Sequence, residues 1–381
     1  MAGWLTHNPA LFRGGPQVEN FRSMSTIYPV RVIRRAPKPS PLPAGEPFQA
    51  PERFSYEGRT LDTAQFLAEM ETTGLIAIRD GRVVFEDYWL GNDASCQTIG
   101  WSVTKSFVSA LVGIAIGEGA IGSVENPVTR YAPSLAGSGY DGVRLKDVLQ
   151  MSSGVRWNED YSDPNSDVGA LGREMVSGGS LDAFAARCVR GCAPGTFNRY
   201  NSIDTHVLGM VVRGATGQTL SDYLHDKLWA PLGMEADGFM VVDATGAEMA
   251  MGGLNAVLRD YARLGCCYLN GGAWNGAQVV PASWVRASVT PDAPHLRPGP
   301  RPNAALPMGY GYQWWVPDDS GAFCAIGVYN QFVWVDPATR TVVAKSSAFH
   351  RYGSSPAIED YRVGDHFAFF AAIADAIGAD S

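Results

Sequence analysis

Residues 101–107 read WSVTKSF and lead directly into FVSALVGIAI at 107–116, whose apolar residues predict a helix over 102–118. This spacing places Ser102 and Lys105 on one face of the first turn, with about 5–6 Å between their Cβ atoms. A lysine this close to a serine, once withdrawn from water, can lose its own proton and accept the serine proton. The free N–H groups of the helix start can also stabilise an oxyanion. The segment therefore predicts a nucleophilic Ser102 activated by Lys105. The alternative is that Ser102 only caps the helix and that Lys105 is a solvated charge.

A tyrosine further along the chain could complete this chemistry. The segment PGTFNRYNS at 194–202 places Tyr200 on a loop before a predicted helix over 202–214. From such a loop its hydroxyl could reach the serine and carry a proton to the leaving group as a general acid or base. The alternative is a packed loop aromatic, with Ser202 as the N-cap of the helix.

Helical periodicity marks the middle of the chain, and strand periodicity marks both ends. A helix is predicted over 61–74, followed by GLIAIRDGRVVFEDYWLG, two alternating runs joined by the hairpin signal Asp80-Gly81. Further helices are predicted over 145–151, 181–189, 219–229, 255–272 and 365–378. Antiparallel strands are predicted over 309–316, 321–327, 331–337 and 340–347.

These elements predict an α+β fold with two lobes, since 381 residues exceed what one core usually holds. Residues 56–101 and 250–381 would form a mixed lobe, in which an antiparallel sheet is flanked by helices. Residues 102–249 would form an inserted all-helical lobe, with the active site in the cleft between the lobes. Residues 1–55, with PKPSPLPAGEPFQAP at 37–51, are expected to form an arm that wraps over the surface or is partly disordered.

The composition limits the classes of binding partner to expect. Apolar residues make up 46% and charged residues 18% of the chain, as in a compact globular protein. The net charge of -8 argues against nucleic acid or an anionic membrane as the main partner. No secretory signal is recognisable, and no apolar run is long enough to span a bilayer. The six cysteines form no CxxC pair, so we expect reduced thiols in a cytoplasmic protein that uses no metal and no organic cofactor.

Five stretches make the chain resemble the serine β-lactamase and penicillin-recognising superfamily. They occur in the family's order and read WSVTKSF, LKDVLQMSSGV (145–155), PGTFNRYNS, GGLNAVLRDYARLG (252–265) and AIGVYNQFVWVDP (325–337). The resemblance is to the class C-like branch, which includes family VIII carboxylesterases, D-aminopeptidases and 6-aminohexanoate-dimer hydrolases. It implies the β-lactamase/transpeptidase-like fold.

The resemblance also implies roles for individual residues. Ser102 would be acylated, Lys105 would activate it, and Tyr200 would shuttle the proton to the leaving group. The backbone N–H groups of Ser102 and Val328 would form the oxyanion hole. The substrate-binding residues would be Tyr161, Ser202, Ile326 and Gly327.

Two positions depart from the β-lactamase pattern. The Tyr-x-Asn motif reads Tyr200-Asn201-Ser202, and Ala325 replaces the lysine that would hold a β-lactam carboxylate. Both departures are similar to what 6-aminohexanoate-dimer hydrolases and related esterases show. In those hydrolases a loop tyrosine contacts the substrate amide, and the stretch GVRWNEDYSDPNSD at 154–167 offers Tyr161 for that contact.

The roles of several other polar residues stay open. His206 and His225 lie on predicted helices and are expected to pack or to be solvated. His350 could face the cleft, and strand periodicity does not show which way Lys345 points. The acidic loop residues could attract a substrate ammonium or be solvated, and they are Glu159, Asp160, Asp163 and Asp167.

Together these features favour a serine hydrolase that cleaves a small linear amide of the 6-aminohexanoate-oligomer type, or an ester, through an acyl-enzyme. One alternative is a carboxylesterase with weak β-lactamase activity, and another is a non-catalytic penicillin-binding-like sensor. A cell-wall DD-peptidase would need export. The expected partner is a small molecule, and a homodimer would be usual for such relatives.

Overall fold

The largest sheet of the computed structural model joins the two ends of the chain. The structure describes residues 16–354 and 361–379. Seven antiparallel strands follow the order β11-β12-β13-β14-β15-β4-β5. The predicted hairpin supplies β4 (Thr72–Arg79) and β5 (Arg82–Tyr88), and β15 pairs with β4 from Thr341 opposite Arg79 onward. The other strands are β11 (Gly309–Tyr310), β12 (Trp315–Val316), β13 (Phe323–Gly327), β14 (Gln331–Asp336) and β15 (Thr341–Ser347).

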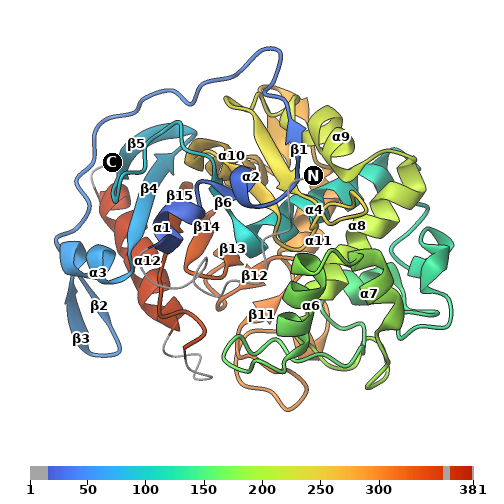
Figure 1. The fold of residues 1–381 in the computed structure, drawn as a ribbon. Coiled ribbons are helices and arrows are strands. Elements are labelled where there is room, and N and C mark those ends of the chain that lie inside the picture. The colour runs from blue at the N-terminus through green and yellow to red at the C-terminus, as the bar shows by residue number, and fades with distance from the viewer. Residues whose placement is uncertain (1–15, 355–360, 380–381) are drawn as a thin grey trace.

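Helices cover both faces of this sheet (Figure 1). On one face, α12 (Val363–Ala379) and α3 (Thr63–Glu69) bury a cluster of aromatic side chains that includes Phe66, Phe332 and Phe370. On the other face, α10 (Leu258–Leu269) packs on β14 and β15. The two-stranded ribbons β2 (Arg53–Tyr56)–β3 (Arg59–Asp62) and β9 (Ala273–Trp274)–β10 (Ala277–Gln278) lie outside the large sheet.

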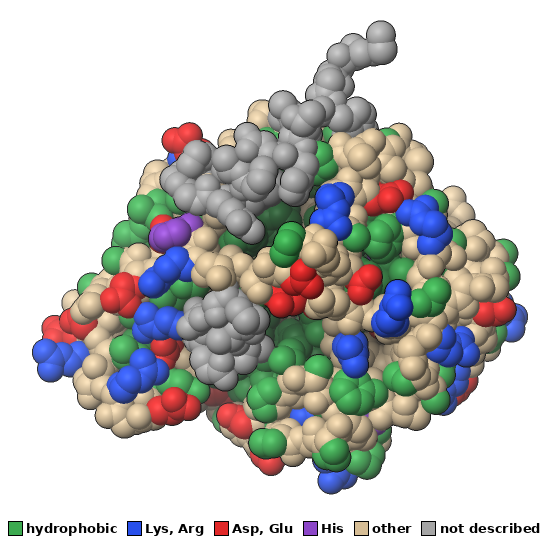
Figure 2. Space-filling model, turned by 60° about the horizontal axis from the view of Figure 1, so that its bottom comes forward, with side chains coloured by type: hydrophobic (Ala, Val, Ile, Leu, Met, Phe, Trp, Pro, Cys, Tyr) green, Lys and Arg blue, Asp and Glu red, His purple; other side chains and the backbone are tan. Residues whose placement is uncertain are grey.

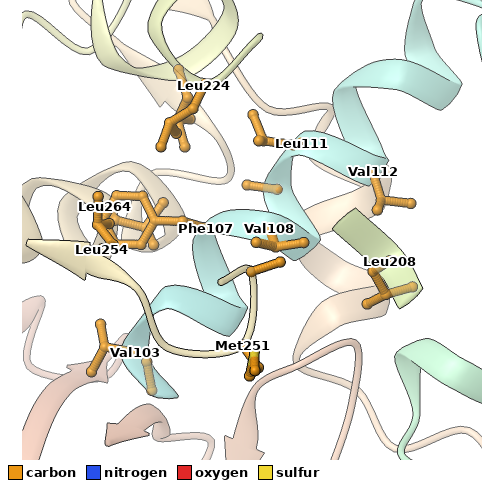
Figure 3. Packing of buried hydrophobic residues seen from close by; sticks show 14 of the residues in the cluster. Val103, Phe107, Val108, Leu111, Val112, Leu208, Leu224, Met251, Leu254 and Leu264 are labelled. Carbon is orange, nitrogen blue, oxygen red and sulfur yellow. The ribbon is translucent and has the colours of Figure 1, made fainter. Parts of the chain in front are cut away.

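Helix α4 (Thr104–Gly117) is the centre of the larger hydrophobic core. It is apolar on nearly all sides, which is typical of a helix that is fully surrounded by protein. Figure 3 shows Phe107, Val108 and Leu111 of this helix among side chains from the neighbouring elements. Helices α8 (Ser202–Thr216), α9 (Leu220–Leu224) and α11 (Ala282–Ser288) contact α4 directly. The same core also includes residues of α5 (Leu145–Leu149), α6 (Asp167–Val176) and α7 (Leu181–Arg187).

A second sheet departs from the expected layout. It has the order β1-β7-β8-β6, with β1 (Val30–Ile33), β6 (Thr98–Ile99), β7 (Gly238–Val241) and β8 (Leu254–Ala256). Strand β7 therefore lies inside the stretch 102–249 that was predicted to be all helical. The residues of β7 are apolar and fully buried, and such a short run cannot be distinguished from a helical segment by periodicity.

The predicted N-terminal arm contains regular secondary structure, in addition to a segment that runs over the surface. Helices α1 (Pro16–Asn20) and α2 (Met24–Ile27) precede β1, which pairs with β7 along its whole length. The Pro-rich part then runs over the surface without a named helix or strand (Figure 1), joined to the body by backbone hydrogen bonds such as Ser40 N to Gly233 O. Residues 1–15 of the predicted arm lie outside the described residues.

Several predicted element boundaries shift for local reasons. The helix expected over 61–74 ends at Glu69, because Glu71 adopts a positive φ and the chain then enters β4. The strand expected over 309–316 is split into β11 and β12, and Gln313 has a φ of 62° at the break. Helices α6 and α11 were not predicted. Within 16–354 and 361–379, none of the helices combines the length and the apolar character that a bilayer crossing requires.

A pair of glycine substitutions tests the packing around α4. A Cβ added at Gly113 would overlap the indole ring of Trp284, whereas one added at the exposed Gly172 of α6 would meet open space. We expect Gly113→Ala to lower the free energy of unfolding by about 1–3 kcal/mol because the core is overpacked. Gly172→Ala, the matched control, should raise it by about 0.5–1 kcal/mol because it relieves the backbone entropy cost of a helical glycine. Chemical denaturation measures both, and equal effects would contradict the packing described here.

Candidate active site

Most of the residues expected to carry the chemistry line one cleft, and Lys105 and Ser202 lie outside its lining. The cleft has a volume of about 380 Å³, and its lining comes from the turn before α4, the loop 154–167, the loop before α8, the end of β13 and residues near the start of α12. The size suits a small molecule. Figure 2, which turns the lower side of Figure 1 toward the viewer, shows apolar side chains in a recess with acidic side chains beside it. The lining residues are Ser102, Trp157, Asn158, Glu159, Asp160, Tyr161, Arg199, Tyr200, Ala305, Leu306, Met308, Trp315, Ile326, Gly327, Val328, Tyr352, Tyr361 and Val363.

Ser102 lies on a strained turn. It is the middle residue of a 3₁₀ turn, Trp101–Val103, that leads into α4, and the preceding Trp101 has a φ of 46°. Such a conformation is costly for a residue with a large side chain and is found mainly where the surrounding structure enforces it. Here the Trp101 ring lies 5.5 Å from that of Phe21 and 5.6 Å from that of Tyr329. Aromatic neighbours thus hold the turn that presents Ser102 to the cleft.

The end of β13 packs directly against this turn. Any side chain at Gly327 would overlap the carbonyl oxygen of Gly100, so only glycine permits this approach. Gly327 and the following Val328 line the same cleft as Ser102. Ile326 also lines the cleft, whereas Ala325 points into the larger core and is 1% exposed.

Lys105 is buried in the first turn of α4. Its Nζ donates to the carbonyl oxygen of Met251 at 2.7 Å and to Oγ of Ser202 at 3.2 Å. Burial lowers the pKa of Lys105 to about 7, while the charges of Glu159 and Asp204 act in the opposite direction. A large fraction of the lysine is therefore neutral at neutral pH.

Tyr200 lies between Lys105 and an aromatic wall. Its ring stacks on Trp315 with 5.2 Å between centroids, and the Nζ of Lys105 is 5.3 Å from its ring centroid. Both Tyr200 and Ser102 line the cleft. Burial, together with Tyr310 and Glu159, raises the pKa of Tyr200 well above its usual value, while the nearby Ser102 side chain acts in the opposite direction. The residue is thus a protonated hydroxyl next to Ser102.

Ser202 and Tyr161 are joined through one carboxylate. Ser202 is 4% exposed and does not line the cleft, and its Oγ donates to Oε1 of Glu159 at 2.5 Å. The hydroxyl of Tyr161 donates to the same oxygen at 2.8 Å. Tyr161 does line the cleft, whereas Ser202 lies behind it, between Lys105 and Glu159.

The other candidates lie elsewhere. His350 is exposed and pairs with Glu71 at 2.6 Å, and His206 pairs with Asp182 at 2.8 Å. His225 contacts Asp226, away from the cleft lining. Lys345 is buried on β15, where it donates to the hydroxyl of Ser347. The six cysteines, all within the described residues, are free thiols.

Sequence reasoning did not identify the aromatic wall of the cleft. Trp315 and Tyr352 come from segments distant from the motifs, and each belongs to a short stretch whose side-chain direction depends on the tertiary structure. The stretch GYGYQWWV was recognised as strand, but nothing in it distinguishes Trp315, which contacts Tyr200, from the fully buried Trp314. Glu159 was named only as one of several loop acids.

Comparisons with known proteins identify the family of this chain. Residues 63–365 match the family model described as Beta-lactamase. The 6-aminohexanoate-dimer hydrolase of Paenarthrobacter ureafaciens is 34% identical over 299 residues, which cover 76% of this chain and 76% of that protein.

Two solved structures show the same fold. A Bacillus anthracis protein provisionally named a 6-aminohexanoate-dimer hydrolase superposes with a TM-score of 0.80 at 22% identity, covering 96% of this chain and 95% of the other. A family VIII carboxylesterase superposes with a TM-score of 0.59 at 17% identity, covering 81% and 95%. The predicted fold class and the resemblance are confirmed, and the chain belongs to the beta-lactamase family of serine hydrolases, whose members here include amidases and esterases.

Proposed function

We propose that this protein hydrolyses a small linear amide or ester through an acyl-enzyme on Ser102. The observation that carries the proposal is that Ser102 and a protonated Tyr200 line one cleft, while the buried Lys105, three residues after Ser102, holds its Nζ 5.3 Å from the ring centroid of Tyr200. Each of the three can take a distinct part in acyl transfer, as nucleophile, base and proton carrier.

In the proposed acylation, Oγ of Ser102 attacks the substrate carbonyl carbon, and neutral Lys105 accepts the serine proton. The carbonyl oxygen becomes an oxyanion, which the backbone N–H groups of Ser102 and Val328 stabilise. Tyr200 donates its proton to the leaving nitrogen or oxygen, the bond to that atom breaks, and the proton on Lys105 restores Tyr200. In deacylation water attacks the ester carbonyl, its proton passes to the same groups, and Ser102 leaves with a proton as the free acid forms.

The lining of the cleft favours an unbranched aliphatic chain over a β-lactam. Ala325 faces the core, so this strand offers no cation for a β-lactam carboxylate, and Ile326 beside it presents an apolar side chain. The walls are rich in aromatic and aliphatic groups, which stabilise methylene chains by burial. We therefore favour a linear amide of the 6-aminohexanoate type, with a small ester as the second candidate.

The hydrogen bond between Tyr161 and Glu159 limits how Tyr161 could hold the substrate amide. Its single hydroxyl hydrogen is engaged by Glu159, so in this arrangement the oxygen can only accept from a substrate N–H. Donation to the substrate carbonyl would need the Glu159 bond to open.

Substitutions at the three residues test the mechanism. Ser102→Ala should abolish turnover, and Lys105→Met and Tyr200→Phe should each lower kcat by about 10²–10⁴-fold because each removes a proton carrier. Ser106→Ala is the control, because this buried hydroxyl of the same helix donates to the carbonyl oxygen of Gln313 and lies outside the cleft lining. It should keep wild-type activity. Turnover that survives in Ser102→Ala would refute the mechanism.

The pH dependence of kcat/KM tests the protonation state of Lys105. Only the neutral amine can accept the serine proton, and burial lowers the pKa of Lys105 to about 7. We therefore expect kcat/KM to rise as the pH increases through about 7 and then to level off. A profile that falls with increasing pH over this range would show that Lys105 acts as an ammonium.

A panel of substrates tests the proposed preference for a linear amide over a β-lactam. We expect hydrolysis of the 6-aminohexanoate linear dimer and of p-nitrophenyl butyrate, with little turnover of nitrocefin, in assays of wild type against Ser102→Ala. Cleavage of the ester alone would identify a carboxylesterase. Rapid nitrocefin turnover would show that a cation on β13 is not needed. Absence of any Ser102-dependent turnover or labelling would favour a non-catalytic sensor.

A further inference from the structure

Glu159 is the most heavily hydrogen-bonded side chain of the cleft. Its Oε1 accepts from Oγ of Ser202 at 2.5 Å and from the hydroxyl of Tyr161 at 2.8 Å. Its Oε2 accepts from the backbone N–H of Ser202 at 3.0 Å and from the indole N–H of Trp157. A carboxylate has about four acceptor positions, so these bonds leave little capacity for a substrate ammonium. The geometry thus points to an internal role.

The bond between Ser202 and Glu159 determines how Ser202 meets Lys105. A hydroxyl carries one hydrogen, and here that hydrogen is donated to the carboxylate. Oγ of Ser202 therefore turns a free electron pair toward Nζ of Lys105, 3.2 Å away, and acts only as an acceptor. Charge-assisted bonds of this kind are roughly twice as strong as neutral ones, so the orientation is firmly held.

This orientation matters most when Lys105 is neutral. A neutral amine has two hydrogens and one free electron pair. The hydrogens can be donated to the carbonyl oxygen of Met251 and to Oγ of Ser202, the two acceptors observed. The electron pair then remains for the proton of Ser102. If Ser202 instead donated its hydrogen to Lys105, that pair would be occupied and the base would be blocked.

We propose that Glu159 is a positioning residue, which holds the hydrogen of Ser202 and so keeps the free electron pair of neutral Lys105 available to Ser102. This inference rests on the proposed function of Ser102 and Lys105. Glu159 itself touches no reacting atom.

Glu159 also contributes a charge to the surroundings of Lys105. The groups around the lysine amine are the carbonyl oxygen of Met251, Tyr200 on the loop before α8, Ser202 and Asp204 on α8, and Glu159 on the loop 154–167. Ser102 precedes the lysine by three residues, on the turn that leads into α4. The negative charges of Glu159 and Asp204 stabilise the ammonium form against burial. Removal of the Glu159 charge should therefore lower the pKa of Lys105, an effect separate from the orientation of Ser202.

The two effects can be separated with a fluorophosphonate probe. Its rate of reaction with Ser102 reports activation of the serine and needs neither the natural substrate nor deacylation. The labelling rate is measured as a function of pH. At high pH, where Lys105 is neutral, the rate reaches a plateau whose height reports whether the electron pair is available. The midpoint, the pH at which the rate is half of this plateau, reports the charge around the lysine. Wild type, Glu159→Gln, Ser202→Ala and the double variant form a double-mutant cycle.

In Glu159→Gln we expect a plateau rate about 10- to 100-fold lower, the range that corresponds to loss of a hydrogen bond to a charged group. The midpoint should move to lower pH. On the Ser202→Ala background the same substitution should change the plateau by less than about threefold, because no hydroxyl remains to compete for the amine. The midpoint should still move to lower pH.

Two further variants sharpen the interpretation. Glu159→Asp keeps the charge but shortens the reach, so it should lower the plateau with little movement of the midpoint. Asp163→Asn removes a carboxylate from the same loop, where it accepts from Asn158 and Asn165 and not from Ser202. This control should leave both quantities at their wild-type values. Thermal unfolding of each variant shows that the fold is retained.

Equal plateau losses from Glu159→Gln in both backgrounds would overturn the proposal, because the effect would not then pass through Ser202. An unchanged plateau in Glu159→Gln on the wild-type background would also overturn the proposal, because Glu159 would then only stabilise the loop. These failures differ from failure of the proposed function, in which wild type itself would not be labelled or labelling would persist in Ser102→Ala.

Discussion

The proposed chemistry of this protein depends on the burial of one amine. Lys105 is 2% exposed in the first turn of a helix that is itself enclosed by the larger core. Withdrawal from water disfavours the ammonium form, and two carboxylates at the site offset that effect only in part, so the pKa falls to about 7. An exposed lysine at the same position would stay protonated at neutral pH and could not serve as a base. The hydrophobic packing around α4 is therefore part of the active site.

The topology of the large sheet completes the other side of the cleft. Strand β13 approaches the turn that carries Ser102 so closely that only glycine fits at Gly327. This approach depends on the pairing of β15 with β4, which joins strands from opposite ends of the chain. Backbone hydrogen bonding thus brings together the proposed nucleophile, Ser102, and the strand proposed to bind the oxyanion, while the segment between them supplies Tyr200 and Ser202.

Membership in the beta-lactamase family explains the shared mechanism but not the choice of substrate. The same fold is found in a family VIII carboxylesterase and in the Bacillus anthracis protein, which superposes with a TM-score of 0.80. Differences among such proteins must arise at the cleft walls, because fold alone does not determine activity. In this chain the walls combine Trp157, Trp315 and Ile326 with a single acidic loop, and the position of the missing cation, Ala325, is turned into the core.

The sequence by itself determined the helix start, the spacing of Ser102 and Lys105, the Asp80-Gly81 hairpin, the late strands and the fold class. These are local features, set by helical periodicity, turn chemistry and side-chain alternation, and short-range rules can recognise them. Only the tertiary structure decided that β1 and β7 form a sheet, that Ser202 lies behind the cleft, and that Glu159 holds it from 43 residues away. Such contacts depend on which distant segments pack together, and no local pattern in the chain encodes that distance or direction.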